Sequence, residues 1–182
     1  KVALKSLGHN LHLIADMAVP AHTRQDTHLA AVGDPGEPYE KWAAQNTNLS
    51  HLANLNFARE KIDCDNLDNC FKKVAQYSNE NFFSEDTIND KNYKIILADR
   101  KETRNDLEVY YKKNEKGEEY ITYVKDIKSK SFSINQSIIH QSYWQLLSKE
   151  AVLGGAEVIR LFFVEVANAQ NDKSKLEPPP AE

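Results

Sequence analysis

The sequence predicts a mainly α-helical protein, a multi-helix bundle that carries a small antiparallel β-insertion. Apolar residues recur every three or four positions near the start of the chain and again over residues 133–163, which is the periodicity of amphipathic helices. Between them, residues 92–126 contain short runs rich in β-branched and aromatic side chains, which favour strands. We therefore expect one helical domain over residues 1–167.

Four helices are expected before the insertion. The apolar stripe of the first consists of Leu4, Leu7, Leu11, Ile14 and Ala18. The second begins near residues 37–42, where Pro38 is tolerated in the first turn. Ser50 is a candidate N-cap for a third helix that runs toward Ile62, and a fourth covers the apolar positions of residues 71–82.

The insertion is expected to contain three strands, at residues 93–97, 107–111 and 120–124. The last two flank the sequence NEKGEE, in which Gly117 can adopt the positive φ that a hairpin loop needs. Lys and Glu residues are frequent around these runs. The sequence therefore predicts a small antiparallel sheet with a solvated surface.

Helical periodicity resumes at Ser133, and Ser148 is a candidate cap between two helical segments. Residues 151–166 are apolar around much of the helix circumference, so we expect this segment to be central to the core. From residue 168 the chain is polar and ends in PPPAE. Residues 168–182 are therefore predicted to form a disordered tail.

Charge and hydropathy limit the classes of partner. A net charge of −4 and a pI near 5.9 argue against a stable nucleic-acid complex, because gripping a phosphate backbone requires a basic face. Phosphodiester substrates stay open, since bound metal ions would add local positive charge. Charged residues interrupt the most apolar stretch, so no transmembrane segment is predicted. No secretory signal is visible, and because the chain opens in helical register without an initiator Met, we expect a missing N-terminal segment.

The only two cysteines, Cys64 and Cys70, lie in the sequence KIDCDNLDNCF. Their spacing and the Asp- and Asn-rich residues between them suit a small disulfide loop in an exported protein. Two free thiols in a cytoplasmic protein are the alternative that the spacing leaves open. The disulfide is the interpretation that we favour.

Histidines and carboxylates cluster near the start of the chain. His12 and Asp16 are four residues apart in a helical stretch and so share one face. Pro20 then ends the helix, which lets His22 and His28 return toward it from a loop. With Glu40 a little further on, the segment offers the imidazole and carboxylate ligands that zinc prefers; the metal ligands predicted are His12, Asp16, His22, His28 and Glu40. Taken singly, each of these residues also fits a structural or surface role.

The run LGHNLHLIADMAVPAHTRQDTH, followed by EPYEKW, resembles the superfamily of zinc-dependent phospholipase C and the single-strand-specific zinc nucleases. In that family a helix carries H-x-x-x-D, a Pro follows, and a further His lies six residues after the Asp. His12, Asp16 and His22 match these positions. The resemblance is firm over the first forty-odd residues and weak over the rest.

The family's next element, H-x-x-Y-E, is matched only at its end, by Tyr39 and Glu40. Gly36 stands where the His is expected, and His28 is the nearest imidazole. A bacterial subgroup, in which R-x-D-x-H precedes a segment similar to D-P-x-E-x-W, fits the chain better. The resemblance therefore implies a rearranged metal loop.

The resemblance implies a phospholipase C/nuclease-like helical bundle with up to three Zn²⁺ ions. Asp16 would bridge two metals, His12 would bind one of them, and His22, His28 and Glu40 would hold another. The family's remaining ligands and its usual catalytic base precede the H-x-x-x-D helix and are not found in this chain. The implied activity is that of a secreted or periplasmic zinc-dependent phosphoric-diester hydrolase, in which a metal-bound hydroxide attacks a phosphodiester or phospholipid substrate.

Two other functions stay open. The first is a single-strand nuclease of the same superfamily, which would need a base-stacking pocket. The second is a non-catalytic helical module in which one zinc staples a loop. Arg24 is expected to be exposed on the metal loop, where a substrate phosphate or Asp26 would pair with it.

Overall fold

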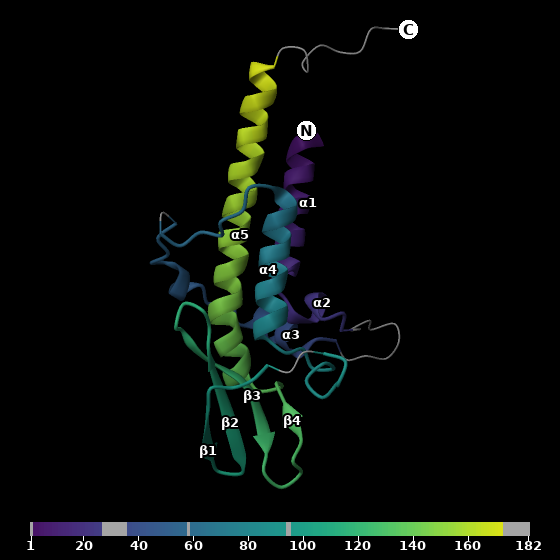
Figure 1. Ribbon diagram of the computed structural model, residues 1–182, viewed down its shortest axis with the longest axis vertical. Helices are drawn as coiled ribbons and strands as arrows, with labels where there is room; N and C mark the ends of the chain where they lie inside the picture. Colours follow the sequence, from purple (N-terminus) through teal and green to yellow (C-terminus); the bar gives the residue numbers. More distant parts are fainter. Residues whose placement is uncertain (1, 27–35, 58, 94–95, 173–182) are drawn as a thin grey trace.

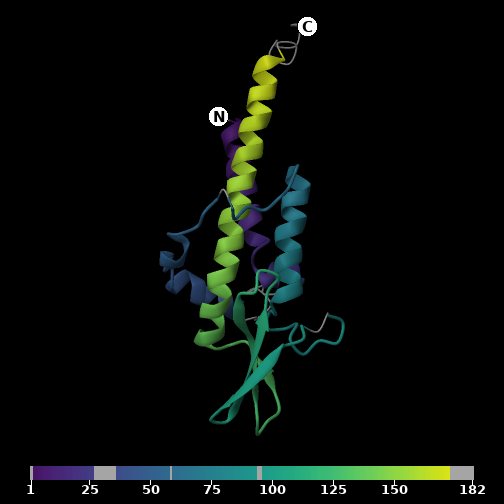
Figure 2. The same ribbon diagram turned by 60° about the vertical axis from the view of Figure 1, so that its left-hand side comes forward.

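The computed structural model describes residues 2–26, 36–57, 59–93 and 96–172 (Figure 1). The elements in chain order are α1 (Val2–Asp16), α2 (Pro20–Thr23), α3 (Pro38–Gln45), the 3-10 helix η2 (Ser50–Leu52), α4 (Leu67–Asn81), β1 (Arg100–Arg104), β2 (Leu107–Lys113), β3 (Glu119–Asp126), β4 (Phe132–Ser133) and α5 (Ser137–Asn171). The 35-residue α5 runs along most of the molecule's length. Figures 1 and 2 show α1 and α4 lying beside its middle, with the sheet at its N-terminal end.

The predicted mainly α, multi-helix bundle is wrong. The structure is a small mixed α/β fold, 50% helical, with 14% of the residues in a four-stranded antiparallel sheet. The reason is that the sheet forms one side of a hydrophobic core and is not a peripheral insertion on a helical bundle. Val109, Val124 and Ile121 of the sheet are buried together with Ile139 and Tyr143 of α5. The alternation of residues 107–124 therefore marks one wall of the larger hydrophobic core.

The strands follow one another in the sheet in the order β1-β2-β3-β4. Gly117, at φ +79°, lies in the turn between β2 and β3, as the sequence predicts for a hairpin. The first strand differs from the prediction, because Tyr93 and Ile96 lie outside any strand and β1 has the charged sequence RKETR. Cross-strand ion pairs stabilise this edge strand, and a charged strand of that kind carries no apolar alternation to reveal it.

Two hydrophobic cores lie along α5. The first is the sheet core just described, which also includes Tyr39 of α3 and the aromatic pair Phe82 and Phe83. The second joins α1, α4 and the middle of α5 through Ile14, Val74 and Leu153. Helix α1 therefore buries the inner part of the predicted stripe, with Ile14 only 1% exposed and Leu7 and Leu11 partly buried, whereas Leu4 is 66% exposed.

The third predicted helix is reduced to the single turn of η2. The side chain of Asn48 accepts a hydrogen bond from the backbone N–H of Ser50 at 2.9 Å. Short polar side chains such as this one offer the backbone a local alternative to helix, which explains the irregular stretch around η2. The fourth predicted helix is present as α4, whose N-cap Asn66 accepts from the N–H of Asn69.

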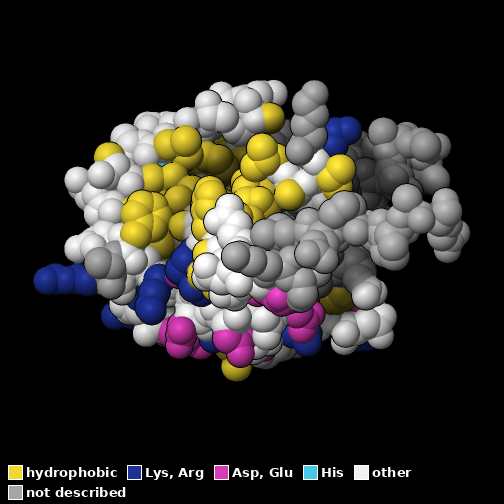
Figure 3. Space-filling view, turned by 90° about the horizontal axis from the view of Figure 1, so that it is seen from above, with side chains coloured by type: hydrophobic (Ala, Val, Ile, Leu, Met, Phe, Trp, Pro, Cys, Tyr) yellow, Lys and Arg dark blue, Asp and Glu magenta, His cyan; other side chains and the backbone are white. Residues whose placement is uncertain are grey.

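Helix α5 is continuous through Ser148, which therefore is not a cap, and the Ser148 hydroxyl donates to the carbonyl of Trp144 within the helix. The helix continues to Asn171, four residues past the predicted domain end at 167, and residues 173–182 lie outside the described part of the chain. Its outer half is less central than predicted, since Ile159 and Phe163 are exposed. Figure 3, which looks down on this end of the molecule, shows hydrophobic side chains gathered on the surface in yellow. None of the described helices is long and apolar enough to span a membrane.

A disulfide bond joins Cys64 to Cys70, with the two Cα atoms 5.2 Å apart. Both side chains are buried in the second core beside Val74. The bond fixes the irregular chain before α4 to the first turn of that helix. The structure thus contains the pairing that the cysteine spacing favours over two free thiols.

Candidate metal centre

The first candidate pair lies near the C-terminal end of α1. His12 Nε2 is 3.5 Å from Asp16 Oδ2, as the i,i+4 spacing requires. The His12 side chain is 74% exposed and that of Asp16 is 28% exposed. Because Ile14 faces the core, this pair lies on the outer face of the helix and not in an enclosed cavity.

The second pair comes from two separate elements. His22 of α2 and Glu40 of α3 are 18 residues apart, and His22 Nε2 lies 3.2 Å from Glu40 Oε1. The side chains are 30% and 38% exposed, so both groups remain accessible to solvent and to an ion. This contact is the long-range pairing that the sequence predicts for a shared metal.

Helix α2 is held firmly against the C-terminal end of α4. The Thr23 carbonyl accepts a hydrogen bond from Asn79 Nδ2 at 2.7 Å, and the Thr23 hydroxyl lies 3.4 Å from the hydroxyl of Ser78. Pro20 stands at the first position of α2, where its missing N–H costs no helical hydrogen bond. The backbone that carries His22 is therefore positioned before any ligand binds.

Arg24 is not the exposed phosphate contact that the sequence suggests. Its side chain is 1% exposed, and it donates from Nε to Thr87 Oγ1 and from Nη1 to the Asn79 carbonyl, both at 2.7 Å. The guanidinium also lies 5.2 Å from the ring centre of Phe83. Burial lowers the pKa of Arg24 from its usual value. Arg24 thus anchors the chain next to His22.

The residues next to Glu40 in the sequence anchor helix α3. Pro38 occupies its first turn, and Tyr39 is buried with its ring centre 6.1 Å from that of Tyr143. Glu37, at the N-cap, is also buried, and one of its carboxylate oxygens has no hydrogen-bond partner within the described residues. Burial, reinforced by the charge of Asp26, raises the pKa of Glu37 to about 8.

The spacing within both pairs fits zinc. Two ligands at about 2.1 Å from one tetrahedral ion are separated by roughly 3.4 Å, which agrees with the observed 3.2 and 3.5 Å. Within the described residues, no group of three or more His, Cys, Asp or Glu side chains converges. His28 lies outside the described residues, so its predicted convergence on His22 and Glu40 stays a prediction.

Two buried groups escaped the sequence analysis. Glu37 stands between Gly36 and Pro38, and His140 lies in the apolar run SIIHQSYW, which suggests nothing more than a core-facing residue. In the structure the buried His140 Nε2 has no hydrogen-bond partner within the described residues, and burial lowers the pKa of this imidazole to about 4. The only sequence signal for either is a polar residue where an apolar one would fit.

Comparisons with protein-family models, with curated proteins and with solved structures gave no match.

Proposed function

We propose that this chain binds zinc and acts as a zinc-dependent phosphodiester hydrolase. The contact between His22 and Glu40 carries the proposal, because it joins an imidazole and a carboxylate across 18 residues at a spacing that suits one zinc ion. The pair His12 and Asp16 supplies a second set of the same chemistry, only four residues before Pro20. The disulfide supports an exported location, secreted or periplasmic, where such bonds persist.

His22 and Glu40 would hold one ion, and His12 and Asp16 another, with His28 as the further ligand predicted from the sequence. Bound zinc supplies a Lewis acid that neutralises phosphate charge and lowers the pKa of a coordinated water. The chain's own contribution is positioning. Arg24 and Thr23 hold α2 against α4, and Tyr39 holds α3 against α5, so the two ligands meet with little backbone reorganisation.

Metal ligation must be distinguished from a plain His–carboxylate hydrogen bond. We would titrate Zn²⁺ into the protein at about neutral pH and measure heat and stoichiometry. We expect one or two zinc ions per chain, and Glu40→Gln or His22→Gln should weaken binding at least tenfold, roughly the loss seen even for groups that only orient ligands. His9→Gln is the matched control, since His9 is an exposed histidine on α1 outside the predicted ligand set.

Hydrolysis is tested on the same variants with bis-(p-nitrophenyl) phosphate. Zinc-dependent turnover that falls in Glu40→Gln and not in His9→Gln supports the hydrolase. Tight binding of a single zinc without turnover would favour the non-catalytic module stapled by one ion. If neither variant changes zinc affinity, the His22–Glu40 contact is a hydrogen bond and the proposed centre is wrong.

A further inference from the structure

A long hollow runs beside the N-terminal half of α5, on its exposed face. Its main part has a volume of about 720 Å³ and lies between α5 and the segment from Trp42 to His51. A volume of this size falls within the range of roughly 300–1,000 Å³ that is typical of small-molecule sites. Ser137, Gln141 and Gln145 of α5 recur at four-residue steps and line the same side of it. We call this hollow the α5 groove.

The described residues that line the α5 groove carry no ionised side chain. None of these ten residues is Asp, Glu, Lys or Arg, although 27% of the chain is charged. Its one titratable side chain is His51, whose pKa is lowered by burial and which lies 2.8 Å from the hydroxyl of Ser148. A neutral wall does not attract an ionic ligand, and a charged group of a ligand buried there would have no counter-charge. The groove therefore favours a neutral ligand.

Both tryptophans of the chain stand in this groove. The indole N–H of Trp144 donates to the Asn48 carbonyl at 2.9 Å, which fixes the orientation of its ring. The ring of Trp42 lies 6.2 Å from that of His140, centre to centre. Both side chains are only half-buried, so part of each aromatic surface faces the hollow. Rigid aromatic faces are negative at the centre and attract the polarised C–H groups of a ligand.

Amide side chains complete the wall. Gln141 and Gln145 are exposed and make no side-chain hydrogen bond within the described residues, so their donors and acceptors are available to a ligand. Asn46 donates a hydrogen bond from its amide nitrogen to the carbonyl of Trp42, at 2.8 Å. An amide presents donors and an acceptor side by side, which matches a hydroxyl group that both donates and accepts.

The groove extends at both ends. Toward α3 it shares Trp42 and Ser137 with a hollow of about 370 Å³ that is also lined by His140, whose buried Nε2 lacks a partner within the described residues. A neutral imidazole in this position offers one more hydrogen bond to a neutral polar group. Lys41 and Glu85 also line that hollow, so the charged residues of the wall are confined to its ends.

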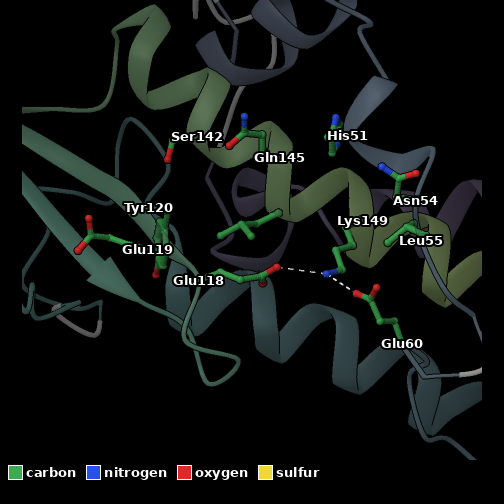
Figure 4. Close-up of a pocket in the computed structure, with 11 residues that line it drawn as sticks. His51, Asn54, Leu55, Glu60, Glu118, Glu119, Tyr120, Ser142, Gln145 and Lys149 are labelled. Atoms are coloured by element: carbon green, nitrogen blue, oxygen red, sulfur yellow. Dashed lines mark hydrogen bonds and ion pairs between the residues drawn. The ribbon is translucent and has the colours of Figure 1, made fainter.

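Toward the sheet it shares His51 and Gln145 with the pocket of Figure 4. There Lys149 points to Glu60 and Glu118, and the dashed lines mark these ion pairs. The charges at this end are therefore paired with one another.

We propose that the α5 groove binds a neutral oligosaccharide. Sugar rings carry apolar C–H faces that stack on aromatic rings and hydroxyl rims that bond to amides, and the groove supplies both without ionised side chains. This site is distinct from the metal centre, because Trp42 follows Glu40 by two residues and so projects from the other side of α3. The proposal is therefore independent of the proposed hydrolase.

Intrinsic tryptophan fluorescence tests this directly, since both indoles lie in the groove. We would titrate cellotetraose, maltotetraose and tetra-N-acetylchitotetraose into the whole protein, with tetragalacturonate as the charged comparison, and confirm affinities by calorimetry. We expect at least one neutral tetrasaccharide to change the emission and release heat. The double variant Gln141→Ala/Gln145→Ala should weaken that binding about tenfold, the loss of roughly two neutral hydrogen bonds.

Gln170→Ala is the matched control, because Gln170 is an exposed glutamine on the same helix, far from the groove. The helical circular dichroism of all variants should equal that of the parent protein, since the three glutamines are exposed. The proposal is overturned if no neutral tetrasaccharide changes the fluorescence at millimolar concentration. It is equally overturned if tetragalacturonate binds as well as the neutral sugars.

Discussion

A Cβ atom on Gly154 would lie 3.0 Å from Cγ1 of Ile14, so α5 and α1 touch at a point where only glycine fits without adjustment. Val74 of α4 is equally close to the same position. The three helices therefore meet at Gly154 in the second core. Its neighbour Gly155 is less crowded, because a Cβ there would lie 3.6 Å from Leu11, an ordinary contact.

The two glycines give a matched pair of variants. Gly154→Ala and Gly155→Ala gain the same helix propensity, so a difference between them isolates the cost of overpacking. We expect Gly155→Ala to be more stable than Gly154→Ala by about 1–3 kcal/mol in the free energy of unfolding. Chemical denaturation measures this. Equal stabilities would mean that α1 moves away from α5 without cost.

Arg24 should be important for stability although it lies in the predicted metal loop. Arg24→Lys removes the planar guanidinium that donates to both Thr87 and the Asn79 carbonyl. We expect the free energy of unfolding to fall by about 2–3 kcal/mol. Arg59→Lys, at an exposed position, should change stability by less than about 0.5 kcal/mol. Thermal denaturation of both variants checks this, and similar melting temperatures would contradict the anchoring role.

Asp16→Asn should reduce activity much more than stability. An amide keeps the shape of the side chain but cannot bridge cations, and the Asp16 side chain is outside the core. We expect stability to change by less than about 1 kcal/mol, while zinc-dependent hydrolysis of bis-(p-nitrophenyl) phosphate falls. Asp68→Asn, at an exposed carboxylate that also forms an i,i+4 ion pair, is the control. Unchanged turnover in Asp16→Asn would exclude a bridging role.

Glu37 should make the protein less stable as the pH rises. Its folded pKa of about 8 lies above the ordinary value of 4.5, so between these values the folded state holds a proton that the unfolded state releases. The free energy of unfolding should therefore decrease from about pH 5 to about pH 8 and level off above. Glu37→Gln should remove a large part of this decrease, and its stability relative to the parent should grow with pH. Glu115→Gln, at an exposed position, should leave the slope unchanged.

The long helices could be predicted from local patterns. The apolar stripe of α1, with Leu7, Leu11 and Ile14, is the face that the structure packs against α4 and α5. Gly117 identified the β2–β3 hairpin, because a positive φ at a turn is a local requirement. Such features are encoded within a few residues, and for that reason sequence reasoning reaches them. The candidate ligands His12 and Asp16 belong to the same class, since helical spacing alone brings them together.

The fold class could not be predicted in the same way. Strand β1 is stabilised by ion pairs such as Lys101 with Glu108 of its neighbour β2, and it resembles a loop until that strand is in place. Whether the sheet is an appendage or a core wall depends on what packs with Val109 and Val124, which share one core with Ile139 and its neighbours on α5. That choice is made by contacts between distant parts of the chain.

By itself, the sequence determined the helical periodicity, the hairpin turn, the spacing of the cysteines and the set of candidate ligands. Tertiary structure alone decided that Arg24 is buried, that His22 meets Glu40, and that Trp42 and Trp144 share one groove. The physical reason is the range of the interactions. Backbone dihedrals and one-face stripes depend on neighbours within about a helical turn. Burial and long-range pairing depend on how the whole chain closes around its cores, which no local pattern records.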